Sequence, residues 1–200
     1  MATLLFYEDS HRYTVDGEEV PSVSELTRFI TRELYSDAPQ YVLEQAAKRG
    51  TTIHKATEAL DKFGNVEVDS EIAPYVQAYI NFIKEVNPEW SKIEWAINNG
   101  NLYAGTLDRY GKVKGVPAII DIKSTKNISG LHKIAYTAQL NLYRMALPEE
   151  TKVEALYILQ LKQDGTYKLI PIEIEDELAN ACISLHTAIQ KTKRRKRKVD

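Results

Sequence analysis

Residues 105–125, GTLDRYGKVKGVPAIIDIKST, constrain the fold of this chain more than any other segment. Two apolar runs flank a turn marked by glycines, which is typical of a β-hairpin. Charged side chains interrupt both runs: Asp108 precedes the turn, and Asp121 and Lys123 lie at the end of the second run. A strand end that needs only solvation can be charged in many ways. Two carboxylates and an ammonium at the ends of apolar strands suggest that they hold something between them.

Side-chain alternation in the second strand separates its charges from its apolar residues. In an extended strand, Asp121 and Lys123 share one face, while Ile120 and Ile122 point to the other. The hairpin brings Asp108 towards Asp121, and neighbouring carboxylates repel each other unless a cation neutralises them. Oxygen ligands suit Mg²⁺ or Mn²⁺, and Lys123 could orient or deprotonate a bound water or stabilise a developing phosphorane. The plain alternative is an Asp–Lys ion pair on an exposed hairpin.

Hydrophobic periodicity and turn signals predict further elements on both sides of this hairpin. Ser22 and Glu25 match a helix capping box. The other expected helices span about 40–63, 71–86, 131–147 and 175–190, and the expected strands span a hairpin within 3–20, then 92–97, 101–110, 116–123, 153–161 and 166–174. This order predicts one α/β domain over residues 1–190, with a central mixed sheet flanked by helices and an N-terminal hairpin.

Composition narrows the class of protein. The chain has 200 residues, of which 44% are hydrophobic and 27% charged, as expected for one globular domain. It shows no long apolar run and no targeting signal, which predicts a cytoplasmic location, in a bacterial or phage-infected cell, and no membrane partner. Cys182 is the only cysteine, so an internal disulfide and a thiolate cluster are excluded.

Residues 191–200, KTKRRKRKVD, form a basic segment with seven Lys or Arg and one Asp. The rest of the chain is acidic, with 19 basic and 27 acidic residues. Basic clusters gain affinity for nucleic acid from counterion release. We therefore predict a disordered tail that contacts DNA through Lys191, Arg194, Arg195 and Arg197. A solvated tail or a localisation signal is the alternative.

Five short motifs together resemble one nuclease family. They are VPSVS (20–24), RGTTIHKATE (49–58), GTLDR (105–109), IIDIKST (119–125) and QLNLY (139–143). In this order they resemble the RecB-like branch of the PD-(D/E)XK nuclease superfamily, near its mitochondrial genome-maintenance exonucleases and small phage-encoded exonucleases. Leu107 stands where the family name has proline. The four-cysteine iron–sulfur motif and the GxxxxGK[ST] motif of helicase-linked relatives are absent from the sequence.

The resemblance implies a restriction-endonuclease-like core and a role for each matching residue. Asp108 and Asp121 would be metal-binding carboxylates, and the Ile122 carbonyl would be a backbone ligand of the metal. Lys123 would be the catalytic lysine and His54 a further metal ligand. A histidine on a helix is otherwise most often a satisfied core or surface residue.

The remaining candidates support the site or contact DNA. Gln139 and Tyr143 match the Q-x-x-x-Y motif, which supports the active site and contacts DNA, although a tyrosine beside an apolar stripe often only packs. Glu94 lies where many relatives carry a glutamate, and Glu58 could orient His54 from one helical turn away. Ser22 and Arg28 are expected DNA contacts.

The implied function is a metal-dependent DNA exonuclease that uses Mg²⁺ or Mn²⁺ and works in the replication, recombination or repair of phage or cellular DNA. Its partners would be DNA with free ends, single-stranded or frayed, and a single-strand-annealing or single-strand-binding protein. We expect residues 21–26 and the helix of His54 to arch over the hairpin, with Arg28, Tyr35 and Tyr41 nearby. Alternatives are a structure-selective or sequence-specific endonuclease of the same fold, a non-catalytic DNA-binding relative, and a scaffold protein with an accidental D-x-K hairpin.

Overall fold

The computed structural model describes residues 3–196, and side chains up to residue 193. Three predicted DNA contacts, Arg194, Arg195 and Arg197, therefore lie outside the described side chains. The helices are α1 (Val23–Leu26), α2 (Arg28–Leu34), α3 (Gln40–Phe63), α4 (Ala73–Val86), α5 (Gly130–Met145) and α6 (Asp176–Lys196), with a short 3-10 helix η1 (Glu8–Ser10). The strands are β1 (Leu4–Tyr7), β2 (Arg12–Val15), β3 (Glu18–Val20), β4 (Glu89–Asn99), β5 (Tyr103–Val113), β6 (Val116–Lys123), β7 (Ala155–Leu161) and β8 (Tyr167–Ile172).

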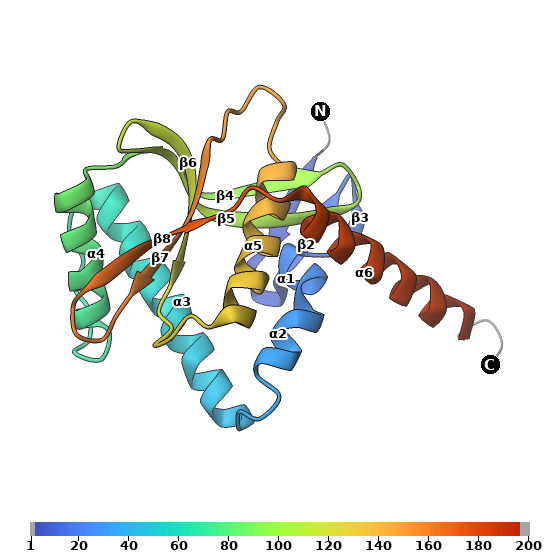
Figure 1. Cartoon of the computed structure of the whole chain (residues 1–200), viewed down its shortest axis with the longest axis horizontal. Coiled ribbons are helices and arrows are strands. Elements are labelled where there is room, and N and C mark those ends of the chain that lie inside the picture. The colour runs from blue at the N-terminus through green and yellow to red at the C-terminus, as the bar shows by residue number, and fades with distance from the viewer. Residues whose placement is uncertain (1–2, 197–200) are drawn as a thin grey trace.

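The centre of the fold is a mixed five-stranded sheet in the order β4-β5-β6-β7-β8. Neighbouring strands are antiparallel except for β6 and β7, which are parallel. A parallel pair needs a crossover connection, and α5 provides it between β6 and β7 (Figure 1). The prediction of an α/β chain with a central mixed sheet flanked by helices is confirmed.

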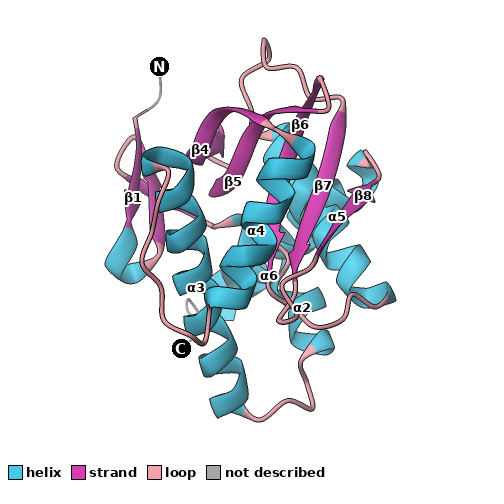
Figure 2. Ribbon diagram, turned by 90° about the vertical axis from the view of Figure 1, so that its left-hand side faces the viewer, coloured by secondary structure: helices cyan, strands magenta, loops and turns pink. Residues whose placement is uncertain are grey.

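Helices cover both faces of this sheet. In Figure 2, α3 and α4 lie in front of the strands, and α5 lies behind them. Ile120 and Ile122 of β6 pack towards α3 and α4 in one apolar cluster. Ile119 packs on the other face, in a cluster with residues of α1 and α5. The alternation predicted for this strand is confirmed, so Asp121 and Lys123 lie on the face opposite to Ile120 and Ile122.

The N-terminal region forms its own three-stranded antiparallel sheet, in the order β1-β2-β3. A single hairpin was predicted here, and the third strand is an addition to it. Just after the last strand of this sheet, the amide of Ala104 on β5 donates to the carbonyl of Pro21 at 3.0 Å. The junction positions the start of α1 beside the central sheet.

Helix ends follow their local chemistry. The capping box predicted at Ser22 and Glu25 is confirmed, since each side chain accepts from the backbone amide of the other residue. Gly64, at φ 78°, ends α3 in the left-handed conformation that glycine adopts without strain. The last helix runs to Lys196, beyond the predicted end at residue 190. Lysine and arginine are good helix formers and no glycine or proline interrupts this stretch, so the basic segment continues the helix at least to Lys196. None of the described helices is long and apolar enough to cross a membrane.

Candidate active site

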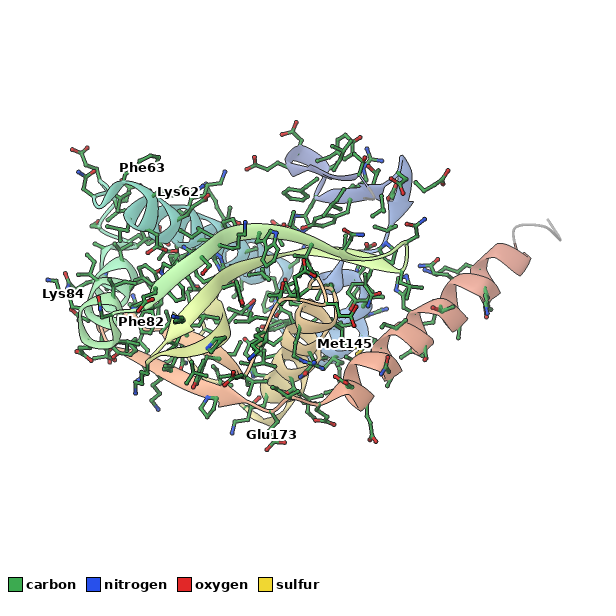
Figure 3. All side chains as sticks on the ribbon, turned by 90° about the horizontal axis from the view of Figure 1, so that it is seen from above. Lys62, Phe63, Phe82, Lys84, Met145 and Glu173 are labelled. Carbon is green, nitrogen blue, oxygen red and sulfur yellow. The ribbon has the colours of Figure 1, made fainter. Side chains whose placement is uncertain are left out.

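A cavity of about 630 Å³ lies where the N-terminal sheet, α1, α3, α5 and strands β4–β6 meet. Figure 3 shows the N-terminal sheet and α3 on the same side of β4 and β5. Most of the predicted site residues line this cavity: Ser22, His54, Glu58, Glu94, Asp108, Asp121, Lys123, Gln139 and Tyr143. Arg28 is not among the residues that line it. Helix α2, which carries Arg28, packs against α5 instead.

Asp108 occupies the floor of this cavity on β5, where it is almost fully buried. Its Oδ2 atom accepts a hydrogen bond of 2.6 Å from the amide of Ile122. Its Oδ1 atom lies 3.5 Å from Nδ1 of His54. Burial alone would raise the pKa of Asp108, but His54, Lys123 and the Ile122 amide lower it to about 2. Asp108 is therefore an ionised carboxylate across the physiological pH range.

His54 faces Asp108 from the middle of α3. Its Nε2 atom lies 3.0 Å from the carbonyl oxygen of Ile122, and its Nδ1 atom lies 4.0 Å from Oε1 of Glu94. Burial alone would lower the pKa of His54, but the charge of Asp108 and the hydrogen bond to it raise the pKa to about 9. The Ile122 carbonyl, the predicted backbone ligand, thus contacts the imidazole.

Asp121 and Lys123 form an ion pair two residues apart on β6, with Nζ 2.7 Å from Oδ2. Apart from this contact with Lys123, the buried Oδ2 of Asp121 has no hydrogen-bond partner within residues 3–196. Burial raises the pKa of Asp121 to about 6, Asp108 adds to the rise, and Lys123 opposes it. Burial would lower the pKa of Lys123, but Asp121 and Asp108 hold it above its ordinary value.

Glu94 enters the cavity from an unusual backbone conformation. Its φ of 46° lies in the left-handed region, inside β4, where a non-glycine residue costs about 1–3 kcal/mol. Its neighbours Ile93 and Trp95 pair with Arg109 and Leu107, so Glu94 lies opposite the stretch that carries the Asp108 carboxylate. Burial and Asp108 raise the pKa of Glu94 to about 7, against the effect of His54.

Behind Glu94 lies a hydrogen-bonded group that we call the Arg109 cluster: Arg109, Asp61, Thr57 and Tyr79. The fully buried Arg109 guanidinium donates to Asp61 at 2.6 Å, to Thr57 at 3.3 Å and to Glu94 at 3.0 Å. The Tyr79 hydroxyl donates to Asp61 at 2.6 Å. The sequence alone predicts no role for these residues. One signal was present, because His54, Thr57 and Asp61 are spaced to share one face of a helix.

Gln139 and Tyr143 lie together on α5, and Nε2 of Gln139 donates to the Tyr143 hydroxyl at 3.1 Å. The Tyr143 ring packs against Gly105 of β5. A Cβ atom at position 105 would lie 2.8 Å from Cε1 of Tyr143 and 3.0 Å from a methyl of Val23. Only glycine allows this close approach of β5, α1 and α5, so Gly105 sets the position of the Tyr143 ring in the cavity.

One predicted orientation is wrong. Glu58 was expected to orient His54 from the next turn of α3, but its carboxylate forms an ion pair with Lys62 at i+4. Lys62 is labelled near the outer end of α3 in Figure 3. The two ring nitrogens of His54 contact Asp108 and the Ile122 carbonyl instead. The orientation of the imidazole therefore depends on β5 and β6, and Glu58 only lines the cavity.

The donor atoms of this site suit a divalent cation. Ligand atoms of His54, Glu94 and Asp108 all lie within 4.8 Å of one another. Two carboxylates and an imidazole match the ligands of Mn²⁺, and the carboxylates also suit Mg²⁺. The buried carboxylate of Asp121, which pairs with Lys123, adds a further oxygen donor to the site. The predicted metal ligands include Asp121. In the structure, Glu94 lies with His54 and Asp108 in the group that could hold a metal, while Asp121 forms an ion pair with Lys123.

Comparisons with known proteins leave the identity of the chain open. The chain matches no family model and no curated protein. Among solved structures, the crystal structure of SSO0001 is similar over 83% of this chain and 76% of that one, with 19% sequence identity and a TM-score of 0.42. A likeness of this degree does not indicate the function of the chain.

Proposed function

We propose that this chain is a metal-dependent DNA exonuclease of the RecB-like PD-(D/E)XK class. One observation carries the proposal: Asp108, Asp121, Lys123 and His54 meet in one cavity although they come from β5, β6 and α3. These are the residues that the motif resemblance selects, and an accidental D-x-K hairpin would not bring the histidine of a distant helix to the same place.

The residues that would hold the cation are Asp108, Glu94 and His54, with Asp121 and the Ile122 carbonyl beside them. When bound, a divalent cation supplies positive charge that polarises a phosphodiester and offsets the charge developing in its transition state. The chain contributes a ligand set that is already ordered, because the Ile122 amide fixes Asp108 and Arg109 fixes Glu94.

Other side chains would act on the substrate directly. The Lys123 ammonium, held charged by Asp121 and Asp108, stabilises negative charge on the phosphate or orients the attacking water. The Gln139 amide and the Tyr143 hydroxyl add hydrogen-bonding groups on the α5 side of the cavity. Ser22 and Ser24, at the start of α1, line the cavity beside them and offer hydroxyl groups.

The experiment is a digestion of matched linear and closed circular single strands with Mn²⁺ or Mg²⁺. We expect degradation of 5′- or 3′-labelled linear DNA from its ends, loss of activity with EDTA, and resistance of the circles. The Asp121→Asn variant is the matched control for a contaminating nuclease. Circles cut as fast as linear strands would make the enzyme an endonuclease. DNA binding without cleavage in either metal would favour a non-catalytic relative.

A further inference from the structure

Three aromatic side chains of the N-terminal region line the same cavity, and none of them has a role in the function proposed above. They are Phe6 on β1, His11 after η1, and Tyr13 on β2. The Phe6 and Tyr13 rings are stacked, with centroids 4.6 Å apart and planes at 23°. The His11 ring meets the Phe6 ring edge-on at 5.4 Å. Together they form an aromatic wall opposite the strands that carry the carboxylates.

Tyr13 is buried and holds the aromatic wall in place, whereas Phe6 is partly exposed. Tyr13 is 2% exposed, and its hydroxyl lies 3.0 Å from Oγ1 of Thr106 on β5. Phe6 rests on this anchored ring but remains 38% exposed, and it stays outside the buried cluster formed by Tyr13, Val15 and its neighbours. The exposed part of the Phe6 ring makes no favourable polar interaction with the water in the cavity. It offers an aromatic surface to whatever enters the cavity.

The wall lies close to the carboxylates. Thr106 and Asp108 are two residues apart on β5, so their side chains share a face about 7 Å apart. Along its axis, a stacked strand rises about 3.4 Å per nucleotide. A strand with one phosphate at Asp108 would therefore place a base within one or two nucleotides of Tyr13 and Phe6. The cavity, at about 630 Å³, has the size of a typical ligand pocket.

We propose that Phe6, supported by Tyr13 and flanked by His11, is a stacking site for an unpaired nucleobase next to the phosphodiester at the carboxylates. The inference rests on the proposed function for its choice of a nucleic-acid ligand. Aromatic stacking tolerates any base, because every base has a π-face. A base inside a duplex already stacks on both neighbours, so this site selects single-stranded or frayed DNA without reading its sequence.

The test measures binding and does not depend on cleavage. A short single strand carrying 2-aminopurine is titrated with Asp121→Asn protein, whose stacking contacts are unchanged, and both fluorescence quenching and Kd are recorded. Phe6→Ala should weaken binding about 10-fold and remove the quenching, as expected for the loss of one stacked base. Phe6→Trp, which keeps an aromatic face, should restore both. Tyr7→Ala is the matched control, because Tyr7 is an exposed aromatic residue on the same strand that does not line the cavity.

A second arm locates the base. An abasic site moved along the strand should weaken binding at one position in the parent protein, with no further loss at that position in Phe6→Ala. Equal effects of Phe6→Ala and Tyr7→Ala, or no effect of Phe6→Ala, would overturn the stacking site, and so would absence of binding. If wild-type protein binds through Phe6 but never hydrolyses DNA, the exonuclease proposal fails and the stacking site stands. If it hydrolyses DNA and Phe6→Ala binds normally, the reverse holds.

Discussion

Two groups of buried charge lie side by side in this molecule, and they differ in how well their polar atoms are satisfied. In the Arg109 cluster, the guanidinium donates to Asp61, Thr57 and Glu94, and Tyr79 completes the coordination of Asp61. The second group, which we call the Asp121 cluster, comprises Asp121, Lys123, Asp108 and His54. Among the described residues, the buried Oδ2 of Asp121 meets only the Lys123 ammonium, and the pKa values of Asp121 and His54 are raised.

This difference separates stability from function. A fully hydrogen-bonded charge cluster holds elements together, and removing one partner leaves an uncompensated buried charge. The Asp121 cluster lines the cavity, and charged groups with shifted pKa values in a cavity are typical of a site that binds or reacts. Glu94 connects the two clusters, because Arg109 holds its carboxylate near His54. Mutations in the Asp121 cluster should therefore change activity, and mutations in the Arg109 cluster should change stability.

The largest effect is expected for Asp121→Asn on activity. Removing this carboxylate while keeping its shape should lower Mg²⁺-dependent cleavage by about 100-fold or more, the scale of losing one electrostatic contact to a transition state. The free energy of unfolding should change little, because relief from burying the Asp121 charge is offset by the loss of its ion pair with Lys123. Single-turnover assays and urea denaturation measure the two quantities. Near-normal activity of Asp121→Asn would contradict the assignment of the site.

Lys123→Arg and Lys123→Ala should each lose most activity and still bind Mn²⁺. The arginine fork is larger than an ammonium and always charged, so it cannot take the place of Nζ between Asp121 and the Tyr136 ring. Cleavage rates at saturating metal and metal titrations check this prediction. A fully active Lys123→Arg would mean that position 123 supplies only positive charge, and its role in orienting the attacking water would be withdrawn.

For the Arg109 cluster we expect the opposite pattern. Arg109→Met should lower the free energy of unfolding by about 3–5 kcal/mol, because Asp61 and Glu94 lose their buried partner. Urea denaturation measures the change. Lys62→Met is the control, since it breaks an ion pair with Glu58 that lies nearer the surface and should change stability by less than about 0.5 kcal/mol. If Arg109→Met and Lys62→Met proved equally stable, the Arg109 cluster would not hold the fold together.

The smallest effect on both clusters is expected for deletion of residues 191–200. Seven basic residues far from the cavity in sequence should contribute sequence-independent, salt-dependent affinity for DNA. The deletion should weaken binding most at low ionic strength and flatten the plot of log Kd against log salt, with turnover at saturating DNA unchanged. An unchanged salt slope would assign this segment to solubility or localisation.

Much of the fold could be predicted because its signals are local. The hydrophobic periods of α3 and α4, the alternation in β6 and the capping box at Ser22 and Glu25 each depend on residues close in sequence. The Asp108 and Asp121 pair could also be placed, since one short turn connects their strands. The other contacts of the site join segments that are far apart in sequence.

The parts that could not be predicted depend on long-range packing. The left-handed backbone of Glu94 follows from how β4 pairs with β5, which no local pattern encodes. Arg109 was visible as a motif residue, but its burial depends on the docking of α3 and α4. The sequence predicts Phe6 and Tyr13 as residues of a small hairpin, and their place in the cavity depends on long-range contacts of the N-terminal region with β5.

The parallel pairing of β6 with β7 has a consequence for how the chain folds. The β6–β7 pair closes a loop that contains α5, and His54 of α3 contacts Asp108 from more than fifty residues away in sequence. Contacts of this kind form slowly, because the entropy of closing long loops is lost before they are made. Partly folded chains that already have the β5–β6 hairpin thus carry Asp108 and Asp121 without His54 or Tyr143. Whatever reaction the cavity performs, a newly synthesised chain cannot perform it until its folding is complete.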